Sequence, residues 1–248
     1  MHPDWLVPDW NAQGVGAVMT TRRGGLSVPP FDSMNIRHGI GDDPDAVRAN
    51  QRLLADAIGV VPVYLDQVHG VKVARLAGAD GVAGAPVHQA DAAITTETGI
   101  ACTAQVADCL PVLFAAPGAV GAAHAGWRGL AAGVLEATVQ ALCEATGCAP
   151  DRLQAWLGAG IGPERFEVGA DVLQAFGVDP ARESPRFRRQ PDGKWMADLP
   201  ALARDRLRTA GVTAVSGGHW CTVSDPSRFF SFRRDGVTGR MVAAVWLR

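Results

Sequence analysis

The spacing of apolar residues predicts an amphipathic helix in the first quarter of the chain. Val47, Leu54 and Ile58 recur on one helical face, and a glycine follows directly. Asp43 suits the N-cap position, and Pro44 suits the first turn, where its missing N–H has no helical partner to lose. The same apolar spacing predicts three more helices, at residues 130–146, 170–176 and 199–210, and Asp198 suits the N-cap position of the last one.

Short apolar runs fill the middle of the chain and predict β-strands. Pro and Gly interrupt these runs too often for helices, and their connections are too short for parallel crossovers, so we expect partly antiparallel pairing. The runs cover residues 92–95, 100–106, 110–115 and 120–124. Further strands are expected at residues 15–21, at 61–67 with 71–76 as its returning strand, at 153–157 and 212–215, and in a hairpin over 229–246.

Strands and helices are mixed along the whole chain, without an internal repeat, a low-complexity segment or a linker. This pattern favours one α/β domain that spans residues 1–248. We predict an α/β/α sandwich, in which helices cover both faces of a mixed sheet.

Composition narrows the possible classes of function. The chain has 248 residues, 48% of them hydrophobic, and a formal net charge of −2, which excludes disorder and gives no footprint for nucleic acid or an anionic membrane. The five cysteines form no regular framework, so we expect reduced thiols. The first ten residues lack the basic and apolar regions of a signal peptide, and no apolar run could span a bilayer. We therefore expect a cytoplasmic protein, with a monomer favoured.

Three short segments carry candidate chemistry, because each places a His or Cys beside the end of an apolar strand. They are Gln67-Val68-His69-Gly70, Ala107-Asp108-Cys109-Leu110-Pro111 and His124-Ala125-Gly126-Trp127-Arg128-Gly129. Imidazole nitrogen and thiolate sulfur together favour zinc, with copper as the softer alternative. Three scattered ligands fit a catalytic site with an open fourth position. Spacing alone leaves Cys102 and His219 as competing ligands.

These segments resemble those of the YfiH-like family, whose members are described as laccase-domain or multicopper polyphenol oxidoreductase proteins and as purine nucleoside phosphorylases. Similar motifs occur in the same order along nearly the whole chain. They include residues 21–27, Asn35, residues 41–44, Ala90-Asp91-Ala92, Gly160-Ile161-Gly162-Pro163, Glu167-Val168-Gly169 and residues 229–240.

The resemblance implies that His69, Cys109 and His124 bind one zinc ion. It also implies phosphorolysis of adenosine, inosine, guanosine and methylthioadenosine, and deamination of adenosine. The substrates would then be a nucleoside and phosphate. The laccase name implies copper, but the chain lacks the many histidines of a multi-copper cluster.

The remaining site residues are assigned by chemistry. Asp108 is a candidate to transfer a proton, or to orient the neighbouring ligand Cys109. Arg22 and Arg128 could hold phosphate by forked hydrogen bonds, and Asn35 is a further candidate substrate contact. Trp127 could stack on a purine or belong to the core.

The chain departs from the family pattern at three positions. Gln51 replaces a common Arg, Phe232 replaces a common Tyr, and Ile36-Arg37 replaces Leu-Gly. If the missing Arg binds phosphate elsewhere in the family, Arg37 or Arg48 would have to substitute.

Three other functions stay open. Cys109 with His69 or His124 could form a cysteine hydrolase or an amidase that edits peptidoglycan precursors. The chain could be a copper polyphenol oxidase. A structural zinc module would require a fourth ligand, such as His219 or Cys221.

Overall fold

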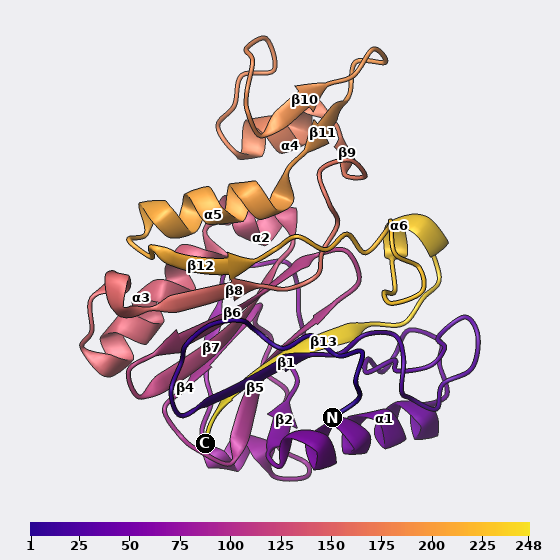
Figure 1. Cartoon of the computed structure of the whole chain (residues 1–248), viewed down its shortest axis with the longest axis vertical. Coiled ribbons are helices and arrows are strands. Elements are labelled where there is room, and N and C mark those ends of the chain that lie inside the picture. The colour runs from indigo at the N-terminus through magenta and orange to yellow at the C-terminus, as the bar shows by residue number, and fades with distance from the viewer.

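The computed structural model describes residues 1–248 and contains two mixed β-sheets stacked face to face (Figure 1). One sheet has the strand order β1-β13-β5-β2, with β2 parallel to β5 and the other pairs antiparallel. Its strands are β1 (Val15–Met19), β13 (Met241–Leu247), β5 (Ile100–Val106) and β2 (Val61–Val63).

The second large sheet has six strands in the order β12-β8-β6-β7-β4-β3. Its outer pairs, β12 with β8 and β3 with β4, are parallel, and the central strands are antiparallel. The strands are β12 (Ala214–Gly217), β8 (Gln154–Leu157), β6 (Leu110–Ala116), β7 (Ala119–Ala125), β4 (Ala92–Thr95) and β3 (Val73–Arg75). A third, small antiparallel sheet projects at one end of the molecule (top of Figure 1) and consists of β9 (Glu167–Val168), β10 (Phe187–Arg189) and β11 (Trp195–Ala197).

Helices cover the outer faces of the two large sheets. Helix α1 (Pro44–Ile58) packs on the four-stranded sheet, and α2 (Trp127–Ala132), α3 (Val134–Thr146) and α5 (Leu199–Thr209) pack on the six-stranded sheet. The remaining helices are α4 (Ala170–Ala175), α6 (Phe232–Asp235) and the 3₁₀ turns η1 (Gly78–Gly81) and η2 (Pro150–Arg152). None of the helices is both long and apolar enough to cross a membrane.

The alternation of side chains along the buried strands divides the core into layers. In β13, Val242, Ala244 and Trp246 face α1. Met241, Ala243 and Val245 of the same strand face the other sheet. Both faces of such a strand are buried, so the whole strand is a continuous apolar run, as expected for an inner layer.

The predicted α/β class with mixed β-pairing is confirmed, and the β-layer consists of two stacked sheets. The caps of two helices are also confirmed: the Asp43 carboxylate accepts from the Asp45 N–H, and the Asp198 carboxylate accepts from the Ala201 N–H. Pro44 begins α1, as expected.

Three predictions about elements were wrong. The helix expected at residues 130–146 is two helices, because Gly133 has φ +104° and turns the chain between them. The segment 71–76 does not pair with 61–67 but joins the other sheet, where β3 runs beside β4. Residues 229–246 form no hairpin, because Ser231 caps α6 and β13 pairs with β1 and β5 instead.

Candidate metal centre

The structure brings His69, Cys109 and His124 together at one end of the central strands β6 and β7 of the six-stranded sheet. Cys109 directly precedes β6, and His124 lies in the adjacent strand β7 opposite Pro111. His69 comes from the loop between β2 and β3. One ligand atom from each residue can be chosen so that all three atoms lie within 4.8 Å of one another. His124 is buried, Cys109 is half-buried and His69 is exposed, so the group opens to the surface on one side.

Unusual backbone conformations aim these side chains. His69 has φ +62° and Asp108 has φ +87°, and both lie in the left-handed region that non-glycine residues rarely adopt. Such conformations cost free energy, and they persist where the surrounding structure holds them. The strained residues are a candidate ligand and the neighbour of another, which is the distribution expected at a functional site.

Two glycines of the 124–129 segment allow the loops to approach each other. A Cβ atom on Gly126 would lie 2.7 Å from His69 Cδ2 and 3.1 Å from Cys109 Sγ. A Cβ atom on Gly129 would lie 2.8 Å from the carbonyl oxygen of Gly70. The absence of side chains at these positions therefore sets the spacing of the three ligands.

Asp91 orients both histidines from beneath the group. It is buried, and its Oδ1 accepts hydrogen bonds from His124 Nδ1 and from the His69 N–H, each 2.8 Å long. Its Oδ2 accepts from the N–H groups of Val68 and Gly70. Because the carboxylate occupies Nδ1 of His124, the Nε2 atom is left as the metal ligand, which is the usual arrangement of a histidine held by a carboxylate. The sequence offered one signal for this role, a carboxylate directly before an apolar strand.

The donor set fits one divalent metal ion. With metal–nitrogen distances of about 2.0 Å and a metal–sulfur distance of about 2.3 Å, tetrahedral ligands lie roughly 3.3–3.7 Å apart. Cys109 Sγ lies 3.8 Å from His69 Nε2, near this spacing, and the three candidate atoms lie within 4.8 Å of one another, so the group would tighten by about 1 Å to bind an ion. Three protein ligands leave a fourth position for a reactant.

In the metal-free chain, the pKa values of Cys109 and His124 are shifted so that both side chains are charged near neutral pH. Burial raises the pKa of the Cys109 thiol, but the charge of His124 and hydrogen bonds from both histidines outweigh burial and lower that pKa to about 6. Burial lowers the pKa of His124, but the Cys109 charge and the Asp91 carboxylate raise it to about 9. Between these values a thiolate faces an imidazolium, and a thiolate is the form that binds metal.

Two cavities meet at His69 and Cys109. The first, which we call the apolar cavity, has a volume of about 270 Å³ and is lined by Trp127, Ile161, Phe166 and Leu199, with Asp108, Arg128 and Arg233. The second, which we call the arginine cavity, has a volume of about 370 Å³ and is lined by Arg37, Arg240, Gln67 and Gln105, with Ile40, Val106 and His124. Both cavities share His69, Ala107, Cys109 and Phe232.

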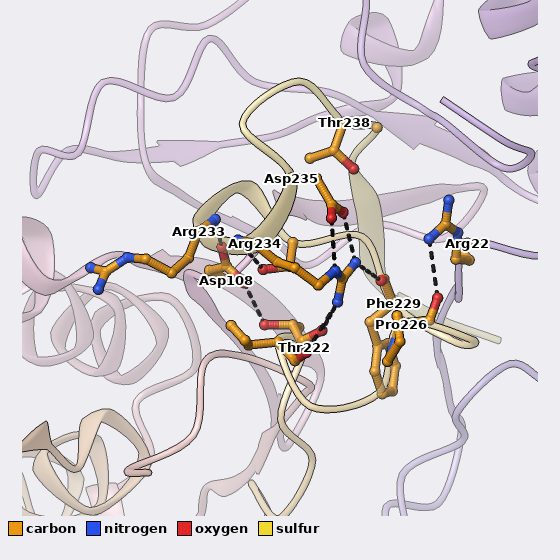
Figure 2. Close-up of polar contacts among 12 residues, drawn as sticks. Arg22, Asp108, Thr222, Pro226, Phe229, Arg233, Arg234, Asp235 and Thr238 are labelled. Atoms are coloured by element: carbon orange, nitrogen blue, oxygen red, sulfur yellow. Dashed lines mark hydrogen bonds and ion pairs between the residues drawn. The ribbon is translucent and has the colours of Figure 1, made fainter. Parts of the chain in front are cut away.

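Beside His69 and Cys109, two further predicted site residues, Arg128 and Asp108, line the apolar cavity. The Arg128 guanidinium lies 4.3 Å from the centre of the Trp127 ring and makes no ion pair with the protein, so it is free to meet an anion or a polar substrate group. The Asp108 carboxylate accepts from Thr222 Oγ1 and from the Arg233 N–H, each at 2.6 Å (Figure 2). Asp108 thus joins the loop at Thr222 and helix α6 to the ligand Cys109.

The structure does not bring Arg22 and Asn35 to either cavity. The Arg22 guanidinium donates to the Pro226 carbonyl (Figure 2), and it also donates to Asp32 and stacks on Phe230, so its hydrogen-bonding capacity is used within the protein. Asn35 is fully buried, and its side-chain amide is hydrogen-bonded to Asp42 and to backbone groups. Neither placement supports direct contact with a substrate.

Of the other residues considered for phosphate binding or as further metal ligands, one lines a cavity at the site and the rest lie away from it. Arg48 pairs with Asp45 on the exposed side of α1, and Gln51 donates to the Ile36 carbonyl, whereas Arg37 does line the arginine cavity. Cys102 is buried between the sheets. His219 and Cys221 line a different cavity, so neither is a fourth ligand of the group.

Arg234 fixes the segment that covers the site. Its guanidinium donates to the carbonyl oxygens of Thr222, Val223 and Phe229 and pairs with Asp235 (Figure 2). Helix α6, which contains Arg234, also carries Phe232, a residue shared by both cavities. This role could not be predicted from the sequence, because the main acceptors of the Arg234 guanidinium are backbone carbonyls.

Two stacked mixed sheets that carry a His/Cys/His group between two cavities define an α/β protein with a candidate catalytic metal centre. The model of the family described as multi-copper polyphenol oxidoreductase laccase matches residues 16–248, and the chain belongs to this laccase or YfiH family.

Curated relatives and solved structures agree with this assignment over nearly the whole chain. The chain is 49% identical to a purine nucleoside phosphorylase of Pseudomonas aeruginosa and 44% identical to the purine nucleoside phosphorylase YfiH of Escherichia coli, each alignment covering 98% of both proteins. The chain is 42% identical in sequence to a Neisseria meningitidis protein of known crystal structure. The two structures superpose with a TM-score of 0.90 over 98% of this chain and 99% of that one. The structure of YlmD from Geobacillus stearothermophilus is 33% identical with the same TM-score, and covers 98% of this chain and 96% of that one.

Proposed function

We propose that this chain is a zinc-dependent purine nucleoside phosphorylase that accepts adenosine, inosine, guanosine and methylthioadenosine, and that it also deaminates adenosine. The observation that carries the proposal is the group of His69, Cys109 and His124, which lies between the apolar cavity and the arginine cavity. The names of the curated relatives support the same reaction.

In phosphorolysis, a phosphate oxygen forms a bond to C1′ of the ribose while the bond from C1′ to the purine breaks. The electron pair leaves with the purine, which takes up a proton. The apolar cavity suits the flat base, because it offers the Trp127 and Phe166 rings beside the Arg128 guanidinium. Zinc held by the three ligands would supply a Lewis acid next to the reacting groups.

We assign Asp108 the transfer of a proton to or from the purine. It lines the apolar cavity next to Cys109, and two hydrogen bonds hold its carboxylate in a fixed orientation. Each carboxylate oxygen retains a second lone pair for a proton. In the deamination of adenosine, water replaces the amino group at C6 and ammonia leaves, a reaction that also needs a group to carry protons.

The proposal is tested by incubating metal-replete protein with adenosine, with and without phosphate, and separating the products by chromatography. Adenine and ribose 1-phosphate are expected only with phosphate, and inosine is expected in both reactions. If none of these products forms, the proposal is wrong. His124→Ala should lose both the metal and turnover, and elemental analysis of the purified protein distinguishes zinc from copper.

One observation favours a second function, that of a cysteine hydrolase. Cys109, His124 and Asp91 form a thiol, imidazole and carboxylate series, and the thiol pKa is low in the metal-free chain. If this is the function, metal-free protein should hydrolyse an amide substrate, and alkylation of Cys109 should abolish that activity. Activity that requires added zinc would exclude it.

A further inference from the structure

Two arginines in the arginine cavity have no acidic partner. Arg37 makes one long side-chain hydrogen bond, 3.4 Å from Nη1 to Gln105 Oε1. Arg240 donates from Nη1 to the carbonyl oxygens of Thr238 and Gly239. Both side chains are half-buried, and neither takes part in an ion pair. Most donors of the two guanidiniums are therefore left for a ligand in the cavity.

The two positive charges act on each other. Burial, followed by the charge of Arg37, lowers the pKa of the Arg240 guanidinium from its usual value. Like charges that are partly removed from water are costly unless an anion is present. The negative charges that oppose this effect are those of Cys109 and Asp108. An anion bound between the two guanidiniums in the cavity would relieve their repulsion.

Asn35 holds the backbones of Arg37 and Arg240 next to each other through hydrogen bonds. Its Oδ1 accepts from the Arg37 N–H at 3.1 Å and from the Arg240 N–H at 2.8 Å, across 205 residues of sequence in the second case. Its Nδ2 donates to the Arg37 carbonyl and to Asp42. One fully buried side chain therefore fixes the backbone of both arginines on the same wall of the cavity.

We propose that Arg37 and Arg240 form the phosphate subsite, with Asn35 as the residue that positions them; this inference rests on the proposed phosphorylase function. Phosphate would accept forked hydrogen bonds from both guanidiniums. The nucleobase would occupy the apolar cavity, so that the ribose bridges the two cavities at His69 and Cys109, the residues that both share. This arrangement places the attacking phosphate and the leaving base on opposite sides of C1′.

The first experiment measures steady-state phosphorolysis by metal-replete Arg37→Gln and Arg240→Gln proteins. Loss of charged hydrogen bonds should raise the KM for phosphate about tenfold or more, with the KM for the nucleoside nearly unchanged. Arg128→Gln, in the other cavity, should give the opposite pattern. Arg48→Gln, on the exposed side of α1, controls for loss of one positive charge and should change neither constant. An unchanged KM for phosphate in both cavity variants overturns the proposal.

The second experiment separates this proposal from the proposed function. Inorganic phosphate is titrated into metal-replete protein by calorimetry without a nucleoside. Binding by the wild type that is lost in Arg37→Gln and Arg240→Gln supports the subsite even if no nucleoside is cleaved. Absence of phosphate binding by the wild type, or binding that both variants retain, overturns it. If Arg240→Gln does not fold, Arg240→Lys keeps the charge but not the fork, and a raised KM for phosphate is again expected.

Asn35→Ala tests the positioning role. A purely structural loss would lower the melting temperature and the amount of active protein, but would leave both KM values unchanged. A positioning role predicts that the KM for phosphate rises while the KM for the nucleoside does not. Equal changes in the two constants contradict it.

Discussion

At the residue scale, the centre depends on side chains that are absent as well as on those present. Gly126 leaves room for the His69 ring and for the Cys109 sulfur, and Asp91 holds the loop of His69 through three backbone N–H groups. The positions of the ligands are thus set by neighbours that would never touch the metal. Mutation of such neighbours typically lowers metal affinity by about 10- to 100-fold.

We expect Gly126→Ala to weaken metal binding by about 10- to 100-fold while the protein stays folded. The added methyl group would meet the exposed His69 ring, which can swing away, rather than a buried backbone atom. Competition with a chromogenic chelator measures the affinity. Gly70→Ala is the matched control, because its methyl group would have only ordinary contacts, the nearest at 3.5 Å. Equal affinities for Gly126→Ala and the wild type would contradict the prediction.

The reactivity of Cys109 in metal-free protein should follow its lowered pKa. Below pH about 6 the thiol is protonated and slow to react, and above it the thiolate is present, whereas an ordinary cysteine with a pKa of 9.0 would need a far higher pH. Alkylation by iodoacetamide, followed at the Cys109 peptide by mass spectrometry, should therefore have its midpoint near pH 6. His124→Ala removes the stabilising charge and should move the midpoint upward. A wild-type midpoint near 9 would refute this description.

The strand-end pattern beside Gly or Pro marked His69, Cys109 and His124 as candidate ligands but did not separate them from Cys102 and His219, and only the resemblance to the YfiH-like family implied these three. The sequence could not identify the role of Asp91, which depends on a contact with a residue 33 positions away, or that of Arg240. Arg22 was a poor choice for a related reason. Sequence shows that a guanidinium is present but not that Asp32 and Pro226 already use its donors.

At the scale of the elements, local signals again predicted more than distant ones. The caps Asp43 and Asp198 were predictable because a cap acts within one turn of its helix. The division of the helix at Gly133 was missed, because the apolar spacing continues across the turn. The sequence also did not predict that β5 and β6 belong to different sheets. Both strands are buried on both faces, so neither has a polar side that would show which face points to solvent.

Helix α6 has only one turn, so its position depends on side chains outside it. We expect Arg234→Met to lower the free energy of unfolding by about 2–4 kcal/mol, because three carbonyl oxygens lose their donor. Turnover should also fall, since α6 carries Phe232 into both cavities. Urea denaturation measures the stability. Arg233→Met, an exposed neighbour, should cost less than about 1 kcal/mol, and an equal loss in both variants would contradict the role assigned to Arg234.

At the scale of the whole molecule, the hydrophobic layers are separate from the metal centre. One layer lies between the two large sheets, one beneath α2, α3 and α5, and one beneath α1. His69 and His124 belong to none of them, and Cys109 only packs against the edge of the layer between the sheets. The fold therefore has its stabilising surface without the ion, unlike a small zinc-dependent module.

Removal of the metal should accordingly leave a folded protein. The predicted single domain implies one cooperative thermal transition with and without the ion. A metal present at 1,000 times its dissociation constant adds about 4 kcal/mol, which for a chain of this length is a shift in melting temperature of roughly 10 °C. Calorimetry measures the melting temperature of the chelator-treated protein, and far-ultraviolet circular dichroism shows whether that protein is folded. Loss of the dichroism spectrum on chelation, recovered by added zinc, would show instead that the ion holds the fold together, because a structural site provides folding free energy and a catalytic site does not need to.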